Sequence, residues 1–325
     1  MRSPTPRSRP RRARRVAATF AVLAVVGATT AATNGPEVYA APSPVPELSA
    51  ATLGARYAAA RHDIDTARAT AEGVHDGGRA RALSAFLGPG RRFLSFDARS
   101  NGRAVEVIGD LERADRIAVV VPGADGLLTN FDSWKWAGGG SRALYRQAGT
   151  AAPGTRLAVI AWLGYASPST RSAGVVTSGE ATVGAHELHR LVTGLHRVNG
   201  RARFGLLCHS YGSVVCAKTA GRLDGLPVDE IALYGSPGTT FGSAAELKTG
   251  AHVWAGRSSG DWTRFVPKLR LAGIGFGRDP VSPAFGAARF DAGTGPHSAY
   301  LKPGSLPLRN LALIALGRGP EVTHA

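Results

Sequence analysis

Residues 203–217 read Arg-Phe-Gly-Leu-Leu-Cys-His-Ser-Tyr-Gly-Ser-Val-Val-Cys-Ala. An apolar run at 204–208 leads into a turn centred on Ser210, and a helix-compatible apolar run at 214–220 leaves it. The residues two positions before and after Ser210 are small, as required where a strand and a helix nearly touch. The order strand, sharp turn, helix predicts that the Ser210 hydroxyl is lifted out of a sheet. It would lie at a helix N-terminus, whose free N–H groups can stabilise an oxyanion.

Chance is the alternative explanation of this pattern. A serine between small residues recurs easily in a chain of 325 residues that contains 42 glycines. The strand before the turn and the helix after it favour the catalytic interpretation over the chance one. The remainder of the chain tests it, because a reactive serine needs partners.

Apolar runs and helix-compatible stretches alternate along most of the chain. Such alternation predicts an α/β fold with a mostly parallel central sheet and helices on both faces. Asn101-Gly102, between two short apolar stretches, predicts an antiparallel hairpin that opens the sheet. The predicted strands cover 93–97, 103–108, 117–121, 157–162, 204–208, 231–234, 252–255 and 288–291, and the predicted helices cover 141–148, 182–198, 214–223, 244–248 and 306–315.

The first 40 residues are typical of a secretory signal peptide. Seven arginines precede an apolar stretch at 16–32, and Val38-Tyr39-Ala40 offers a small-residue cleavage site. The alternative is an uncleaved membrane anchor, although the apolar stretch is short for a membrane span. We therefore predict a signal peptide at 1–40, a linker and N-terminal helical extension at 41–90, and the main domain at 91–325.

The chain carries a formal net charge of +16. Residues 1–40 contribute seven arginines and one glutamate, or +6, so about +10 remains on the rest. A basic surface favours contact with an anionic cell envelope. No dense basic cluster interleaved with aromatic residues follows residue 40, so the sequence does not support nucleic-acid binding.

The chain has only two cysteines, Cys208 and Cys216, one on either side of Ser210. An exported protein permits a disulfide between them, if the Cα atoms come within bridging range. The alternative is two buried, small apolar side chains below the turn. Two thiols are too few for a typical structural metal site, so we expect no metal.

A serine nucleophile needs a base, and the base needs a third group that orients it. When such a serine follows a strand of a parallel sheet, an acid and then a histidine are expected after later strands. Asp261 follows the predicted strand at 252–255, and His297 lies in a Gly/Pro loop after the last predicted strand. The other candidates for the acid are Asp279, in a turn-like Asp-Pro pair, and Asp291; Asp261 could instead cap a short helix at 262–269.

The sequence also offers candidates for binding the substrate. The backbone N–H of Tyr211, with that of Gly123 or Ala124 in the loop after the strand at 117–121, would form the oxyanion hole. The aromatic residues Phe131, Trp134 and Trp136 follow in that loop and would line an apolar pocket, unless they pack beneath it. The short segment between the strands at 231–234 and 252–255 leaves no room for a large inserted lid.

Several short motifs together resemble an α/β-hydrolase family of high-GC bacteria known only as a domain of unknown function. The resemblance spans roughly residues 92–317 and implies the α/β-hydrolase fold with a triad of Ser210, Asp261 and His297, but no substrate. Cys208 stands where the family often has glycine, and Ala166 where it often has aspartate. The motifs are Pro122-Gly123, Trp162-Leu163-Gly164-Tyr165, Cys208-His209-Ser210-Tyr211-Gly212-Ser213, Gly235-Ser236-Pro237-Gly238, Asp279-Pro280, and His297-Ser298 with Tyr300.

These observations predict a secreted serine hydrolase that cleaves a small or lipid-like ester, or a related acyl bond, through an acyl-enzyme. We expect no cofactor and no stable membrane span after removal of the signal peptide. One alternative is an acyltransferase that acts on envelope glycans or lipids. The other is a noncatalytic envelope-binding protein on the same scaffold.

Overall fold

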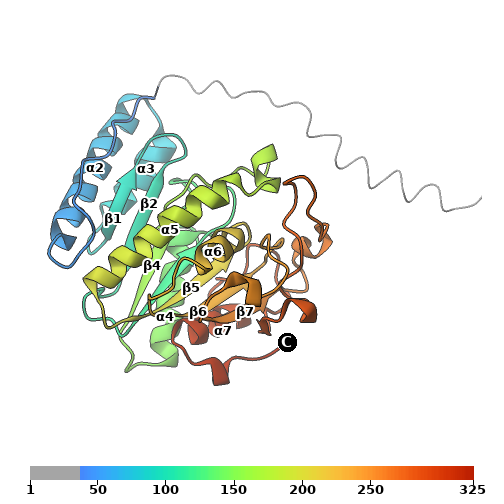
Figure 1. The fold of residues 1–325 in the computed structure, drawn as a ribbon. Helices are drawn as coiled ribbons and strands as arrows, with labels where there is room; N and C mark the ends of the chain where they lie inside the picture. The colour runs from blue at the N-terminus through green and yellow to red at the C-terminus, as the bar shows by residue number, and fades with distance from the viewer. Residues whose placement is uncertain (1–36) are drawn as a thin grey trace, which may run out of the picture.

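The structure is a computed structural model that describes residues 37–325. The basic and apolar stretches of the predicted signal peptide lie outside the described residues. A central sheet of eight strands has helices on both faces, and two further helices flank one of its edges (Figure 1). No helix in this described part has the length and hydropathy that crossing a bilayer requires.

The sheet has the strand order β1-β2-β4-β3-β5-β6-β7-β8. Strands β1 and β2 form the predicted hairpin, β2 runs antiparallel to β4, and all the other neighbours are parallel. The carboxyl ends of the parallel strands therefore meet at one edge. The strands are β1 (Arg92–Asp97), β2 (Arg103–Ile108), β3 (Arg116–Val121), β4 (Leu157–Leu163), β5 (Arg203–His209), β6 (Val228–Tyr234), β7 (His252–Gly256) and β8 (Ala288–Arg289).

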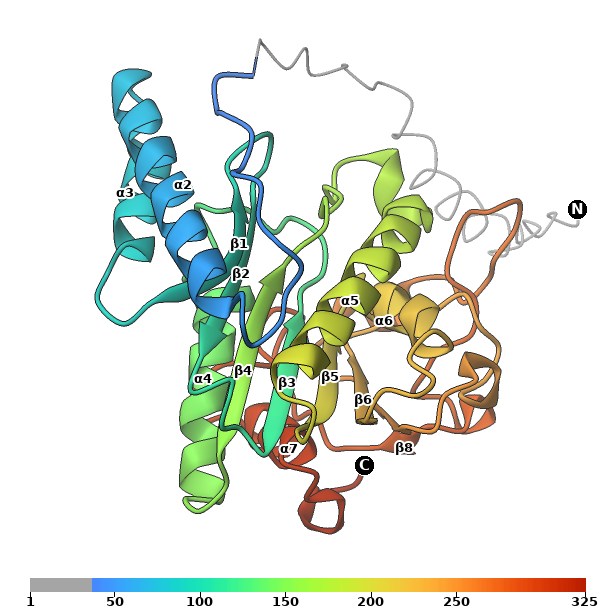
Figure 2. The ribbon, with the colours of Figure 1, turned by 60° about the vertical axis from the view of Figure 1, so that its left-hand side comes forward.

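The central strands are mostly apolar because both of their faces are covered. Helices α5 (Gly179–Val198) and α6 (Gly212–Ala220) pack on one face, and α4 (Ala137–Ala151) and α7 (Leu306–Ala315) pack on the other (Figure 2). Every residue of β3 and β4 is buried. The predicted α/β architecture is thus confirmed, with mostly parallel strands and an antiparallel start.

The N-terminal extension consists of α2 (Leu53–Gly73) and α3 (Gly77–Phe86). Both helices pack on the hairpin edge and share a hydrophobic cluster with β1 and β2. The ring centroids of Phe86 and Phe93 are 5.0 Å apart within this cluster. The extension is therefore joined to the sheet by a common core.

The connections at the carboxyl edge differ in length. Between β6 and β7 there is only the 3-10 turn Ala245–Leu247, so no helix is inserted there. Residues 257–287, between β7 and β8, form a long loop. The alternative considered for Asp261 was that it caps a short helix at 262–269. It caps only the 3-10 turn Trp262–Phe265, where its side chain accepts the N–H of Thr263, because Pro267 follows closely.

Candidate active site

Ser210 lies between the end of β5 and the start of α6, at the carboxyl edge of the sheet. Its φ of 53° is in the left-handed region, which is unusual for a residue with a side chain. Two hydrogen bonds hold this turn: the N–H of Ser210 donates to the carbonyl of Tyr234 at 2.9 Å, and the hydroxyl of Ser213 donates to the carbonyl of Ser210 at 2.6 Å. The backbone that presents the hydroxyl is thus tied to β6 and α6.

The structure brings Ser210, His297 and Asp261 together from three separate loops. Nε2 of His297 is 2.9 Å from Oγ of Ser210. Nδ1 of the same ring is 2.9 Å from each carboxylate oxygen of Asp261. These distances allow one imidazole to bridge the hydroxyl and the carboxylate, which is the arrangement that activates a serine.

Asp261 has no solvent exposure. Burial alone would favour the neutral acid, but hydrogen bonds from His297, Tyr300 and the N–H of Thr263 favour the carboxylate. Together with the charge of His297 they outweigh burial and hold the pKa of Asp261 well below its usual range. The residue is therefore an anion at neutral pH, able to orient the imidazole and stabilise its protonated form.

Gly235, which follows β6, makes room for this group. Its φ is 58°, and a Cβ there would lie 3.0 Å from Oδ2 of Asp261 and 3.2 Å from Cε1 of His297. A side chain at this position would be strained and would press on both partners of Ser210.

The imidazole of His297 lies close to two other rings. The centroid of His209 is 4.6 Å away and that of Trp262 is 4.8 Å away. Nε2 of His209 is 2.9 Å from the carbonyl oxygen of His297, so a neutral His209 with its proton on Nε2 donates there. Burial and the charge of His297 lower the pKa of His209 to about 3, which keeps it neutral.

The two rival carboxylates make other contacts. Asp279 pairs with Arg257 and lies 3.6 Å from Nζ of Lys268. Asp291 accepts a hydrogen bond of 2.8 Å from the N–H of Gly293 in its own turn. Neither of them hydrogen-bonds to His297, whereas Asp261 does.

Two candidate donors of the oxyanion hole lie next to Ser210: Tyr211 follows it in the chain, and Gly123 approaches it from the loop after β3. A Cβ on Gly123 would lie 2.7 Å from Cβ of Ser210, so this loop lies directly against Ser210. Among the hydrogen bonds of residues 37–325, none uses the N–H of Tyr211, Gly123 or Ala124.

Two residues that we did not assign from the sequence hold this loop. The hydroxyl of Tyr165 donates to the carbonyls of Pro122 (3.0 Å) and Gly123 (3.2 Å), and that of Ser167 donates to the carbonyl of Gly123 (2.7 Å). Tyr165 belongs to the Trp-Leu-Gly-Tyr motif, which was the available signal for it. No signal in the sequence pointed to Ser167.

The three aromatic candidates for substrate binding have different surroundings. Phe131 is 1% exposed and packs against Phe86 at a centroid distance of 5.2 Å, so its assignment to a substrate pocket was wrong. Its ring fills the space between the N-terminal helices and the sheet. Trp134 is half-buried, with Nζ of Lys135 5.5 Å from its ring centroid.

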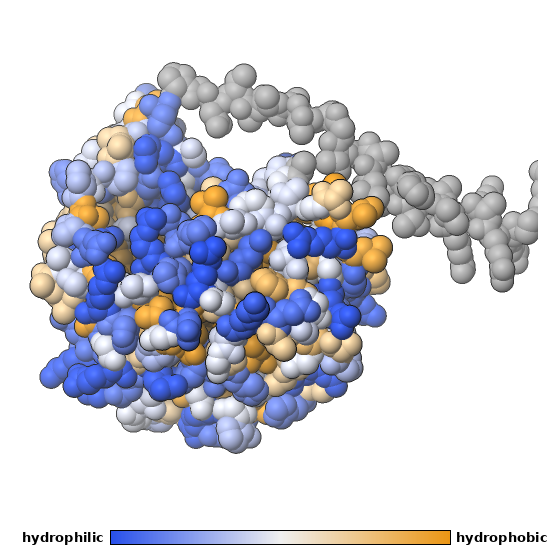
Figure 3. All heavy atoms as spheres, viewed as in Figure 1, coloured by the Kyte–Doolittle hydropathy of each residue, from blue (hydrophilic) through white to orange (hydrophobic). Residues whose placement is uncertain are grey.

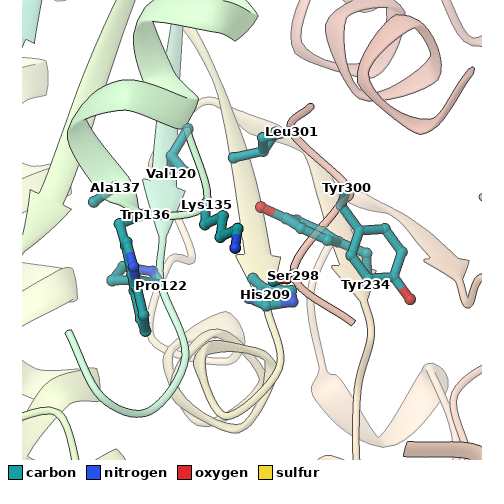
Figure 4. Close-up of a pocket in the computed structure, with 10 residues that line it drawn as sticks. All are labelled: Val120, Pro122, Lys135, Trp136, Ala137, His209, Tyr234, Ser298, Tyr300 and Leu301. Carbon is teal, nitrogen blue, oxygen red and sulfur yellow. The ribbon is translucent and has the colours of Figure 1, made fainter. Parts of the chain in front are cut away.

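Trp136 lines a small cavity beside His209 (Figure 4). Trp136 and Lys135 lie on one side of this cavity, and Tyr234 and Tyr300 lie on the other. Its volume of about 20 Å³ suffices for about one water molecule.

Cys208 and Cys216 form a disulfide across the turn that carries Ser210. Their Cα atoms are 6.4 Å apart, and both side chains are fully buried. Of the two arrangements that the sequence left open, the structure has the bonded one. The bond joins the end of β5 to α6.

Comparisons with known families agree with this architecture. A family profile described as alpha/beta hydrolase matches residues 97–271, which is more than half of the chain. Two uncharacterized proteins of Mycobacterium tuberculosis are also similar. Rv2079 is 34% identical over 254 residues, covering 67% of this chain and 37% of its own length. Rv0963c is 31% identical over 171 residues, covering 49% of this chain and 62% of its own length. The chain thus spans little more than a third of the length of the first of these relatives.

Solved structures are similar at lower identity. XC6422 from Xanthomonas campestris, described as an a/b serine hydrolase without lid, has 13% identity and a TM-score of 0.43, covering 71% of this chain and 95% of its own. Esterase LipW from Mycobacterium marinum has 16% identity and a TM-score of 0.43, covering 80% of this chain and 90% of its own.

Proposed function

This chain belongs to the alpha/beta hydrolase family, and on that premise we propose that it is a serine hydrolase that cleaves an ester or a related acyl bond. One observation carries the proposal: the imidazole of His297 lies 2.9 Å from both the Ser210 hydroxyl and the Asp261 carboxylate. A noncatalytic binding protein has no need of this continuous hydrogen-bonded path.

The reaction begins when Oγ of Ser210 attacks the substrate carbonyl carbon and Nε2 of His297 takes the hydroxyl proton. Asp261 stabilises the imidazolium that results. The N–H of Tyr211 and that of Gly123 or Ala124 donate to the oxyanion of the tetrahedral intermediate. The intermediate collapses, His297 protonates the leaving alcohol, and an acyl-Ser210 ester remains. Water activated by His297 then attacks this ester and releases the acid.

A fluorophosphonate probe tests the proposal without knowledge of the substrate. We expect the probe to label Ser210, as located by mass spectrometry, and labelling to disappear in Ser210→Ala. It should fall by roughly 10³-fold or more in His297→Ala, because the base is lost. Ser84→Ala is the matched control, since Ser84 is exposed on α3, which packs on the hairpin side of the sheet. Absence of labelling in the folded wild-type protein would refute the hydrolase proposal.

We also propose that the protein acts outside the cytoplasm. The basic and apolar residues of the predicted signal peptide and the Cys208–Cys216 disulfide both support export. N-terminal sequencing of protein recovered from the culture medium tests this, with cleavage expected after Ala40. An intact N-terminus on protein retained in the cells would contradict it.

A further inference from the structure

The loop between β7 and β8 exposes large apolar side chains next to the candidate active site. Eleven large hydrophobic side chains are exposed among residues 37–325, and five of them lie within 262–274. Scattered single residues of this kind are normal, but such a concentration marks an interaction surface. The exposed fractions are 51% for Trp262, 78% for Phe265, 75% for Leu269, 81% for Leu271 and 53% for Ile274.

The backbone holds part of this apolar surface in place. Leu271 and Ile274 form a tight hairpin, in which each N–H donates to the other's carbonyl at 3.0 Å and 2.9 Å. The N–H of Gly275 donates to the carbonyl of Val176 at 2.9 Å, which adds a sixth exposed apolar side chain from another loop. Hydrophobic residues gather at this edge of the molecule, with hydrophilic ones between them (Figure 3).

The charges of the same segment all have one sign. Residues 262–278, which we call the apolar loop, contain Arg264, Lys268, Arg270 and Arg278 and no acidic residue. Asp279, immediately after the apolar loop, pairs with Arg257 and lies 3.6 Å from Nζ of Lys268, so Arg264, Arg270 and Arg278 supply the net positive charge of the apolar loop. The surface is therefore both apolar and positively charged, which is the combination that binds an anionic lipid surface.

We propose that the apolar loop docks this protein on an anionic lipid surface. The exposed tips of Phe265, Leu269 and Leu271 enter the boundary between headgroups and acyl chains, and the basic side chains meet lipid phosphates. A second copy of this chain fits less well, because a symmetric contact would bring the two sets of basic side chains together.

Docking in this way brings the candidate active site to the lipid. Trp262 begins the apolar loop, and its ring centroid is 4.8 Å from that of His297. A protein held by the apolar loop therefore has its imidazole and Ser210 near the membrane interface. Lipid binding itself needs no catalysis, so this proposal stands or fails independently of the hydrolase proposal.

Cosedimentation of the full chain with vesicles tests the docking surface. All variants contain residues 1–36 unchanged, so that this segment contributes equally to binding in each of them. They also carry Ser210→Ala, which prevents turnover. We expect the triple variant F265S/L269S/L271S to lower partition onto phosphatidylglycerol vesicles by about tenfold or more. The matched control V74S/V183S removes two exposed valines elsewhere and should bind like the parent.

A second pair of substitutions tests the charges. R264Q/R270Q should lower binding to phosphatidylglycerol vesicles about tenfold at low salt, and change binding to pure phosphatidylcholine vesicles little. Circular dichroism melting should be unchanged in all variants, since the substituted side chains are exposed. Parent-like vesicle binding of the triple variant overturns the proposal. The proposal is also overturned if the parent protein is a dimer, and the triple substitution dissociates that dimer but leaves vesicle binding unchanged.

Discussion

The ring of His209 lies against the ring of His297, and its Nε2 is 2.9 Å from the carbonyl oxygen of His297. The residue before the proposed nucleophile in the sequence thus supports His297, the proposed base. Because His209 is held neutral, it contributes a fixed hydrogen bond and no charge. It positions His297 without taking part in the proton transfer itself.

His209 should make the protein sensitive to acid. The pKa of His209 is about 3 in the folded protein, against a usual 6.5. Between these pH values the unfolded chain binds a proton at His209 and the folded protein does not. The free energy of unfolding is therefore unaffected by His209 protonation above pH 6.5, and it decreases as the pH falls from 6.5 towards 3. Between pH 7 and pH 5 this group alone should lower the free energy of unfolding by about 2 kcal/mol. Urea unfolding at both pH values measures it, and His209→Gln should show a smaller difference. An equal pH dependence in both proteins would contradict this assignment.

Tyr300→Phe should remove a hydrogen bond from the Asp261 carboxylate. The Tyr300 hydroxyl donates to Asp261 and accepts a hydrogen bond of 3.1 Å from the N–H of Ser258. Its loss leaves both buried groups short of a partner, which costs about 1–3 kcal/mol of stability. The pKa of Asp261 should rise, and the rate of fluorophosphonate labelling should fall about tenfold.

Tyr234→Phe is the matched control for this substitution. The hydroxyl of Tyr234 is buried and has no hydrogen-bond partner in the described part of the chain. Its removal should therefore leave both stability and labelling nearly unchanged. Equal losses in the two variants would show that the Tyr300 hydroxyl has no particular effect on Asp261.

Gly123→Ala should block the nucleophile, because the new Cβ would lie 2.7 Å from Cβ and 3.2 Å from Oγ of Ser210. Either the loop or the serine must shift, and a misplacement of this size lowers the labelling rate on the order of 10²-fold. Gly149→Ala in α4 meets no atom within 4 Å and should stabilise the helix by about 0.5–1 kcal/mol with full reactivity. Wild-type labelling of Gly123→Ala would contradict the close approach of this loop.

The double variant Cys208→Ala/Cys216→Ala should unfold more easily than the oxidised protein. The bond closes a short segment, with a sequence separation of 8, and constraining it in the unfolded chain is worth about 2–3 kcal/mol. Urea unfolding measures the loss. Because both sulfurs are buried, a thiol reductant should open the bond only after unfolding, as thiol alkylation and mass spectrometry would detect. Rapid reduction of the native protein would show that the turn carrying Ser210 opens locally.

Much of the fold was predictable because buried parallel strands contain continuous apolar runs, as at 117–121 in β3 and throughout β4. The start of α4 was not predictable. The prediction began at Ser141, but the helix begins at Ala137 and its first turn contains Gly138, Gly139 and Gly140, which disfavour helices by propensity. Their absent side chains decide the matter: a Cβ on Gly138 would lie 2.3 Å from the Phe131 ring. Tertiary packing overrides propensity here, and a single sequence does not record such packing.

The candidate site was predictable to a similar extent. Chain order was enough to nominate Ser210, Asp261 and His297, because the three loops end at one edge of a parallel sheet. The supporting residues were less accessible to this reasoning. Ser167 acts through a hydroxyl that reaches a backbone carbonyl 44 positions away, and a lone serine in a loop carries no pattern. Phe131 was assigned wrongly, because an aromatic residue in a loop near the site has the same appearance whether it faces a substrate or the core.

The left-handed backbone at Ser210 presents the hydroxyl, but it is strained for a residue with a side chain and so lowers the stability of the protein. A glycine would adopt the same φ of 53° without strain, so an inert Ser210→Gly protein should melt at a higher temperature than the active one. Selection for thermal stability alone would therefore favour replacement of Ser210 by glycine. Directed evolution of a more stable variant must screen for turnover at every round.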